Sequence, residues 1–452
     1  MRLRKTITTI VATAILLAGW QLFAVIANQP ELIPSLPRLV RTLCEWLVSG
    51  SFYQSVGATI LRGVLGMSIS FVCAIGMAGL FARFEWVYEL FRPLLAIMRS
   101  IPVISFILLA LIFLNPESIP LMIAFLTMFP LLTENLTRGI LDLRPGLSIM
   151  ARQFHIKRSN VLFQIIYPQL KPFLYSGLAS AAGFGWRAII MGEVLSQCAF
   201  GIGSEMKRAQ NFIAVPELLA WTIVAVFISF FFDKGISKAA DITPKISFAN
   251  EDQTIPTPTL SVLDTKDISY QYGIQHFSHS FQKGIIYGIS APSGKGKTTL
   301  LNLIGGILLP TEGEIHPTRH FGIATIFQQP QLLPYLTAEE NIILPLSSFL
   351  TEEKARRIAQ KHLQEMEMEP FGNRYPKELS YGQQQRIAIA RALAYPSPLL
   401  LMDEPFKGLD EALSHRIIER IREKQMKEER IILFTSHNPD EIRLLADEVI
   451  YL

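Results

Sequence analysis

The first half of the chain consists of long apolar runs separated by short polar stretches. Residues 6–30 carry no charged side chain over 25 positions, and residues 63–82 carry none over 20. A helix needs about 20 apolar residues to cross the hydrocarbon core of a bilayer. Less regular runs, interrupted by a few charges and prolines, lie near 91–114, 118–137, 173–195 and 216–232. The pattern therefore predicts an all-α, multi-pass membrane domain of about six helices over residues 1–238.

The pattern changes after Leu260, where short apolar runs alternate with charged helical segments. This alternation is typical of an α/β domain and predicts one over residues 261–452. Buried strands are expected at 285–290, 399–403 and 431–435, and helices at 299–308 and 384–394. Residues 239–260 are rich in proline and threonine and are expected to form an extended linker.

Composition supports a chain that lies partly in lipid. Of its 452 residues, 50% are hydrophobic and 18% charged, whereas soluble domains average about 25% charged. The 42 basic and 38 acidic residues give a net charge of +4, too small to indicate a nucleic-acid partner. The three cysteines lie far apart, which excludes a small disulfide scaffold.

The distribution of charge predicts which side of the membrane each part occupies. The chain starts with Met-Arg-Leu-Arg-Lys, and residues 138–172 hold six basic residues against one acidic. Because basic loops stay in the cytoplasm, this asymmetry places the N-terminus and the α/β domain there, in a protein of the cell (inner) membrane. Residues 1–27 could instead be a cleaved signal peptide, but their apolar run is longer than a signal peptide needs.

The strongest chemical motif follows the predicted strand 285–290. Residues 291–298 read Ala-Pro-Ser-Gly-Lys-Gly-Lys-Thr, a glycine-rich phosphate loop between strand and helix, with Ala291 in place of the first glycine. Backbone amides at Gly294 and Gly296 and the helix N-terminus favour phosphate, Lys297 reaches it, and Thr298 can hold Mg²⁺. The expected nucleotide contacts are Ala291, Pro292, Ser293, Gly294, Lys295, Gly296, Lys297, Thr298 and Thr299.

Four further motifs occur at characteristic places. The strand 399–403 ends in Asp403, suited to hold Mg²⁺, followed by Glu404, suited to orient a water molecule for attack on phosphorus. Residues 379–383 read Leu-Ser-Tyr-Gly-Gln and precede a basic helix. Two amides, Gln328 and Gln329, follow a short apolar run, and Ser436-His437 follows the strand 431–435.

In their order along the chain, the five motifs resemble the ATP-binding domain of ABC transporters over about residues 260–452. The resemblance implies Glu404 as the catalytic carboxylate, His437 as the switch histidine and Gln328 as the sensor of the γ-phosphate. It implies three metal ligands for Mg²⁺, namely Thr298, Gln328 and Asp403. It also implies four binding residues outside the phosphate loop: Tyr272 on the adenine and, in a signature loop over the partner subunit's nucleotide, Ser380, Gly382 and Gln383. Tyr381 replaces the first glycine of that loop.

The membrane half resembles the permeases of binding-protein-dependent importers. Residues 149–172 match part of their cytoplasmic coupling pattern at Ala151, Ile165 and Pro168, with His155 where the pattern has glycine. Segments around residues 92–102 and 185–193 resemble permeases for nitrate, sulfonates, taurine and thiamine-precursor pyrimidines. An exporter half-transporter remains an alternative, although about 240 residues before the ATPase are fewer than the roughly 300 such exporters use. A non-transporting membrane ATPase is a second alternative.

The resemblance implies a fused permease and ATPase that works as a homodimer, because one chain supplies one phosphate loop and one signature loop. It implies ATP and Mg²⁺ as cofactors and an external solute-binding protein as a partner. Arg187, deep in a predicted helix, could attract an anionic small-molecule solute or could pair with Glu134. Glu193 is expected to reach the outer membrane interface.

Overall fold

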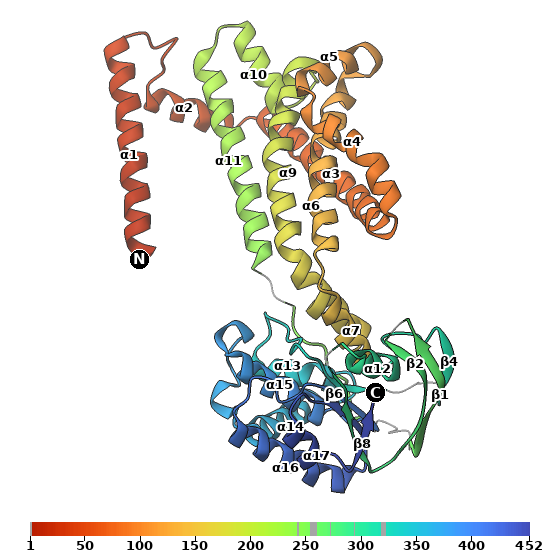
Figure 1. Ribbon diagram of the computed structural model, residues 1–452. Helices are drawn as coiled ribbons and strands as arrows, with labels where there is room; N and C mark the ends of the chain where they lie inside the picture. The colour runs from red at the N-terminus through yellow and green to blue at the C-terminus, as the bar shows by residue number, and fades with distance from the viewer. Residues whose placement is uncertain (1, 242–243, 254–259, 272, 293, 318–321) are drawn as a thin grey trace. The chain divides into compact units, whose positions relative to one another are not determined.

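The computed structural model describes residues 2–241, 244–253, 260–271, 273–292, 294–317 and 322–452. These fall into two compact units, each drawn in Figure 1. Unit 1 comprises residues 1–143 and 169–242, and unit 2 comprises residues 144–168 and 243–452. Unit 2 therefore includes a segment, residues 144–168, that interrupts the sequence of unit 1. The boundaries expected at residues 238 and 260 stay a prediction.

All regular secondary structure in the described residues of unit 1 is helical. Its helices are α1 (Arg2–Ala27), α2 (Leu36–Trp46), α3 (Gly50–Arg83), α4 (Glu85–Ser100), α5 (Val103–Phe113), η1 (Pro116–Ser118), α6 (Ile119–Leu141), α9 (Tyr167–Ser196), α10 (Ile202–Asn211) and α11 (Val215–Ala240). Among the described residues, four helical stretches are long and apolar enough to cross a membrane, at 50–83, 116–141, 158–196 and 215–240. The pair α4 and α5, bent by 94° at its break, makes up to five. The expected six are reached only if the shorter apolar stretch Val11–Ala27 also spans.

Helices α3 and α6 pack closely because α3 buries a stripe of small residues. These recur about once per turn: Ser55, Thr59, Gly63, Gly66, Ser70, Ala74 and Ala78. A Cβ atom added to Gly66 would lie 2.7 Å from the Cβ of Ala124 on α6. Small side chains let helix backbones approach each other in membranes, where dispersion forces rather than the hydrophobic effect hold helices together.

Unit 2 contains two sheets that fit the predicted α/β class. The larger sheet is parallel, in the order β5 (Ala324–Ile326), β6 (Leu399–Asp403), β7 (Ile431–Thr435), β3 (Ile286–Ser290) and β8 (Glu448–Tyr451). The smaller is antiparallel, in the order β2 (Ile274–Gln282), β1 (Val262–Tyr270) and β4 (Glu312–His316). Strands β6 and β7 are buried along their whole length, which explains their uninterrupted apolar sequences.

The helices of unit 2 are drawn with these sheets in Figure 1. They are α7 (Pro145–Gln153), α8 (Arg158–Asn160), the π-helical turn η2 (Val161–Ile166), α12 (Lys297–Ile304), α13 (Ala338–Leu346), α14 (Glu352–Glu365), η3 (Glu369–Phe371), η4 (Pro376–Glu378), α15 (Tyr381–Ala394), α16 (Glu411–Glu428) and α17 (Pro439–Leu445). The helix expected at 299–308 begins at Lys297 and ends before Gly305. Part of the expected linker packs on this unit, since the Ala249 amide donates to the Ser347 carbonyl at 3.0 Å.

Candidate functional site

The phosphate loop connects β3 to α12, as its sequence predicts. Gly294 and Gly296 have φ angles of +81° and +89°, in the left-handed region that favours glycine. A Cβ atom on Gly296 would also lie 2.7 Å from the carbonyl oxygen of Gly273. Lys297 is buried, and its Nζ donates to the carbonyl of Ala291 at 2.6 Å. Pro292, Lys295 and Thr298 are exposed, and Thr299 is half-buried.

Asp403 meets Thr298 at the end of the parallel sheet. Its Oδ2 accepts a hydrogen bond from Thr298 Oγ1 at 2.9 Å, and its Oδ1 accepts one from Thr435 Oγ1 at 2.8 Å. Burial raises the pKa of the Asp403 carboxyl, and the two hydroxyl donors oppose that shift. Thr298 and Asp403 thus offer two converging oxygen atoms, the ligand type that Mg²⁺ takes beside nucleotide phosphates. Within the described residues, no group of three or more His, Cys, Asp and Glu side chains could hold a metal by itself.

Glu404 lies next to Asp403 in a left-handed conformation, with φ of +50°. Its Oε1 is 3.2 Å from Gln328 Nε2 and 3.1 Å from His437 Nε2, and its Oε2 is 3.2 Å from Lys407 Nζ. Partial burial alone would raise the pKa of Glu404, but Lys407, His437 and Gln328 lower it overall. The carboxylate is therefore ionised at neutral pH and held by three donors.

His437 also approaches the phosphate loop. Its Nδ1 lies 3.4 Å from Lys297 Nζ, while its Nε2 faces Glu404. The structure thus brings together the residues of the loop, the two carboxylates, Gln328 and His437, which come from four separate strand ends. Tyr272 and Ser293, also expected at the nucleotide, lie outside the described residues.

The signature loop occupies the N-terminus of α15. Ser380 is the N-cap: its Oγ accepts from the Gln383 amide at 3.3 Å, and Gln383 Oε1 accepts from the Ser380 amide at 2.9 Å. This reciprocal pair is a capping box and fixes the loop on the helix. Gly382 is required by packing, because a Cβ there would lie 2.6 Å from the carbonyl of Gly408. Ser380 is exposed, and its expected contact with a partner's nucleotide stays a prediction.

Two site residues were not identified from the sequence. Lys407 lies three positions after Glu404 and contacts it. This spacing is visible in the sequence, but many pairs of charged surface residues have the same spacing. Thr435 reaches Asp403 because β6 and β7 pair in parallel with these two residues in register. That register follows from the sheet order, which no local signal encodes.

The 144–168 segment is built into the core of unit 2. Ala151 and Ile165, matched to the coupling pattern, are both buried, at 3% and 0% exposure. The ring of Phe154 packs edge-to-face on Tyr395 at 5.2 Å and under the guanidinium of Arg391 at 5.4 Å. Arg391 is itself buried and donates to the carbonyls of Pro330 and Gln331, which follow Gln328 and Gln329 in the chain.

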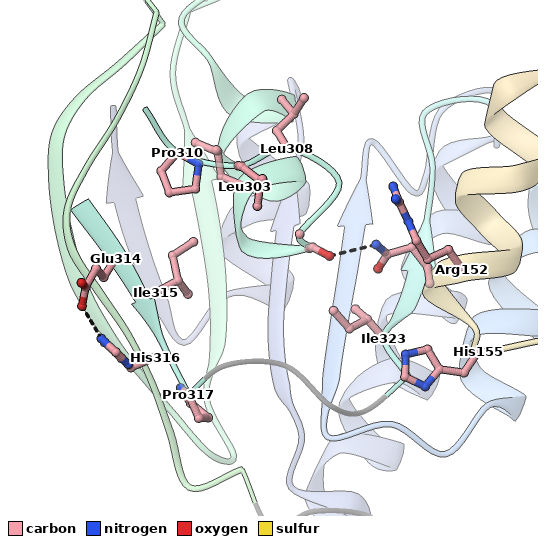
Figure 2. Close-up of a pocket in the computed structure, with 14 residues that line it drawn as sticks. Arg152, His155, Leu303, Leu308, Pro310, Glu314, Ile315, His316, Pro317 and Ile323 are labelled. Carbon is pink, nitrogen blue, oxygen red and sulfur yellow. Dashed lines mark hydrogen bonds and ion pairs between the residues drawn. The ribbon is translucent and has the colours of Figure 1, made fainter. Parts of the chain in front are cut away.

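The backbone conformation at His155 is one that glycine adopts easily, which agrees with the glycine that the coupling pattern has at this position. Its φ is +46°, in the left-handed region where an L side chain is strained. Its ring faces a cavity of about 600 Å³ that lies between this segment and the end of α12, where Figure 2 also shows Arg152, Leu303 and Ile323. Burial lowers the pKa of His155, so the ring is neutral at physiological pH.

Comparison with known families assigns both halves of the chain. Residues 274–407 match the family described as ABC transporter. Residues 68–233 match the family described as binding-protein-dependent transport system inner membrane component. The first match falls in the predicted α/β domain, and the second falls in the predicted membrane domain.

Among curated relatives, an uncharacterised ABC transporter ATP-binding protein of Methanocaldococcus jannaschii is 34% identical over 201 residues, covering 40% of this chain and 85% of the relative. The Fe(3+) ions import ATP-binding protein FbpC of Rhizobium etli is 35% identical, covering 40% of this chain and 54% of the relative. The glucose import ATP-binding protein GlcV of Saccharolobus solfataricus is 35% identical, with coverages of 38% and 52%. The chain thus spans about half the length of these two import proteins.

Among solved structures, a dimeric ATP-binding cassette in a post-hydrolysis state with ADP and phosphate is 32% identical, with a TM-score of 0.40, and covers 42% of this chain and 94% of that chain. The family assignment rests on the sequence matches. The chain belongs to the ABC transporter family, and its ATPase fold is joined to membrane helices that match the importer-type permease model.

Proposed function

We propose that this protein imports a small solute across the cell (inner) membrane at the expense of ATP. In this proposal two copies of the chain form the transporter, the ATPase lies in the cytoplasm, and an external solute-binding protein delivers the solute. The observation that carries the proposal is the 144–168 segment. It lies within the permease match in sequence, yet it packs in the core of the ATPase fold through Phe154 and Ile165.

The proposed chemistry assigns a role to each residue of the site. Lys297 and the amides of the phosphate loop bind the β- and γ-phosphates. Thr298 and Asp403 would hold Mg²⁺, which supplies charge neutralisation on the phosphates. Glu404, ionised and fixed by its three donors, orients the attacking water, and His437 and Gln328 hold Glu404 in place.

The experiment that tests this function separates nucleotide binding from hydrolysis. Glu404→Gln in the full-length protein should bind ATP normally but hydrolyse it at least about a hundredfold more slowly, because orientation of water depends on the carboxylate. Lys297→Ala should instead weaken ATP binding. Glu419→Gln, on an exposed face of α16, is the matched control and should behave as the wild type. Wild-type turnover by Glu404→Gln would remove Glu404 from the mechanism.

Transport assays on the full-length protein distinguish the two alternative functions. Vectorial solute flux that needs no external binding protein would favour an exporter half-transporter. ATP hydrolysis without solute flux in proteoliposomes would favour a non-transporting membrane ATPase. The match of residues 68–233 to an importer-type permease favours import over both.

We further propose that the solute is a small anion. Arg187 lies on the membrane-spanning helix α9 and is exposed on the surface of unit 1. Its suggested partner Glu134 pairs instead with Arg99 and Arg138. An exposed guanidinium at membrane depth is costly in lipid, so it favours a face that meets an aqueous pathway or a second copy. Phe184, three residues before Arg187, lines a cavity of about 310 Å³ beside the α4–α5 break, together with Arg99 and Thr127.

A further inference from the structure

Tyr381 stands where the signature pattern has glycine, and its side chain turns back toward the chain's own ATP site. It is the first residue of α15 and is 42% exposed. Its hydroxyl donates a hydrogen bond to the backbone carbonyl of Gln328 at 2.8 Å. Its ring lies against Gly408, where an added Cβ would be 2.8 Å from Tyr381 Cδ1. The side chain therefore contacts two loops that flank the predicted catalytic carboxylate.

Both contacts lead on to Glu404. Gln328, whose carbonyl receives the tyrosine hydroxyl, donates from Nε2 to Glu404 Oε1 at 3.2 Å. Lys407, the neighbour of Gly408, lies 3.2 Å from Glu404 Oε2. The tyrosine thus contacts the backbone of Gln328, one of the three donors to Glu404, and Gly408, the neighbour of a second donor, Lys407.

We propose that Tyr381 is a positioning residue that links the signature loop to Glu404 of the same chain. Movement of the signature loop then shifts the backbone of Gln328 and, through its side chain, the orientation of the carboxylate. A glycine at position 381 has no group that could make this link. The proposal rests on the proposed role of Glu404 in hydrolysis.

The test compares Tyr381→Phe, which removes only the hydroxyl, with Tyr451→Phe, a 79% exposed tyrosine on β8. In the full-length protein, Tyr381→Phe should lower kcat for ATP hydrolysis about tenfold, as expected for the loss of one hydrogen bond that orients a catalytic group. ATP binding and the melting temperature should stay unchanged, and Tyr451→Phe should match the wild type. Unchanged kcat, or a raised KM with unchanged kcat, would overturn the proposal.

A double-mutant cycle tests the path through Gln328. Gln328→Ala removes the donor to Glu404, so adding Tyr381→Phe to it should lower kcat by much less than tenfold further. Full additivity of the two effects would show that Tyr381 acts by another route. Failure of the proposed function is a separate outcome, because it appears as normal turnover by Glu404→Gln, whereas failure of the tyrosine link leaves Glu404→Gln inactive.

Discussion

The side-chain amide of Gln153 donates a 2.8 Å hydrogen bond to the carbonyl oxygen of Gly305, the C-cap residue that follows the phosphate-loop helix α12. The backbone of Gln153 is held as well, since its carbonyl accepts from the Ile323 amide at 2.7 Å. Gln153 is buried at 5% exposure. A residue from the permease half of the sequence is thus fastened directly to the helix that begins at the phosphate site.

We predict that Gln153→Ala weakens the coupling of ATP hydrolysis to transport. The substitution leaves the buried Gly305 carbonyl without its donor, which costs about 1–3 kcal/mol of docking free energy. The measurement is the ratio of solute flux to ATP hydrolysis in proteoliposomes, which should fall while basal hydrolysis remains. Arg158→Ala, an exposed change in the same segment, should leave the ratio unaltered. An unchanged ratio in Gln153→Ala would show that this hydrogen bond does not transmit the coupling.

A second prediction concerns the buried carboxylate of Glu193 in unit 1. Its side chain is fully buried inside the unit, and the expected position at the outer membrane interface stays a prediction. It accepts hydrogen bonds from Arg62 Nη1 at 2.7 Å, from Thr59 Oγ1 at 2.9 Å and from the Gly203 amide at 2.9 Å. Arg62→Ala should therefore destabilise the protein by about 3–5 kcal/mol, because a buried charge loses its partner.

The matched change neutralises both charges. The double variant with Arg62→Met and Glu193→Gln should recover a large part of the melting temperature lost in Arg62→Ala. Thermal unfolding in one detergent provides the comparison. If the double variant were as unstable as the single one, packing of the arginine stem, and not its charge, would account for the loss.

A third prediction concerns Arg187. Replacing it with Gln should lower uptake of an anionic solute while ATPase activity and dimer assembly persist, because the guanidinium supplies the attraction for the anion. Solute uptake and basal ATP hydrolysis are measured side by side. Loss of both with misassembly, rescued by neutralising Glu134, would instead make the arginine structural. The pairing of Glu134 with Arg99 and Arg138 argues against that rescue.

The fourth prediction is a pH dependence that originates at His362 in α14. Burial, with the positive charges of Lys424, Lys361 and Arg430, lowers the pKa of His362 to about 3, although Nδ1 lies 2.7 Å from Glu365. In the unfolded chain the pKa of this histidine is near 6.5. Below that pH the unfolded state therefore binds more protons at His362 than the folded state does. The free energy of unfolding therefore keeps the full contribution of His362 above about pH 6.5 and loses it progressively as the pH drops toward 3.

The loss between pH 7.5 and 5.5 should be about 1 kcal/mol from this residue alone. His362→Leu removes the group, so the unfolding transition of the ATPase unit should lose that part of its pH dependence. Calorimetry of both proteins at the two pH values gives the measurement. An identical pH dependence in wild type and variant would mean that His362 titrates normally in the fold.

The sequence alone determined the local chemistry of the protein. Three features are short contiguous patterns: the phosphate loop, the carboxylate pair after an apolar strand, and the histidine after another strand. Each pattern predicts the local backbone structure around it. The membrane helices follow from long apolar runs, several of them interrupted by a few charges and prolines, because a bilayer demands a minimum length of apolar helix. The α/β class of the second half was predictable for the same reason, since buried parallel strands need continuous apolar segments.

Tertiary structure decided which distant residues meet. Thr435 reaches Asp403 only through the register of β6 and β7, and Arg62 finds Glu193 only when α3 packs against α9. The burial of Phe154 in the ATPase fold and the contact of Tyr381 with Gln328 also join positions far apart in the chain. Such contacts depend on the complementary shapes of whole elements, and a sequence pattern that spans one element carries no information about its partner.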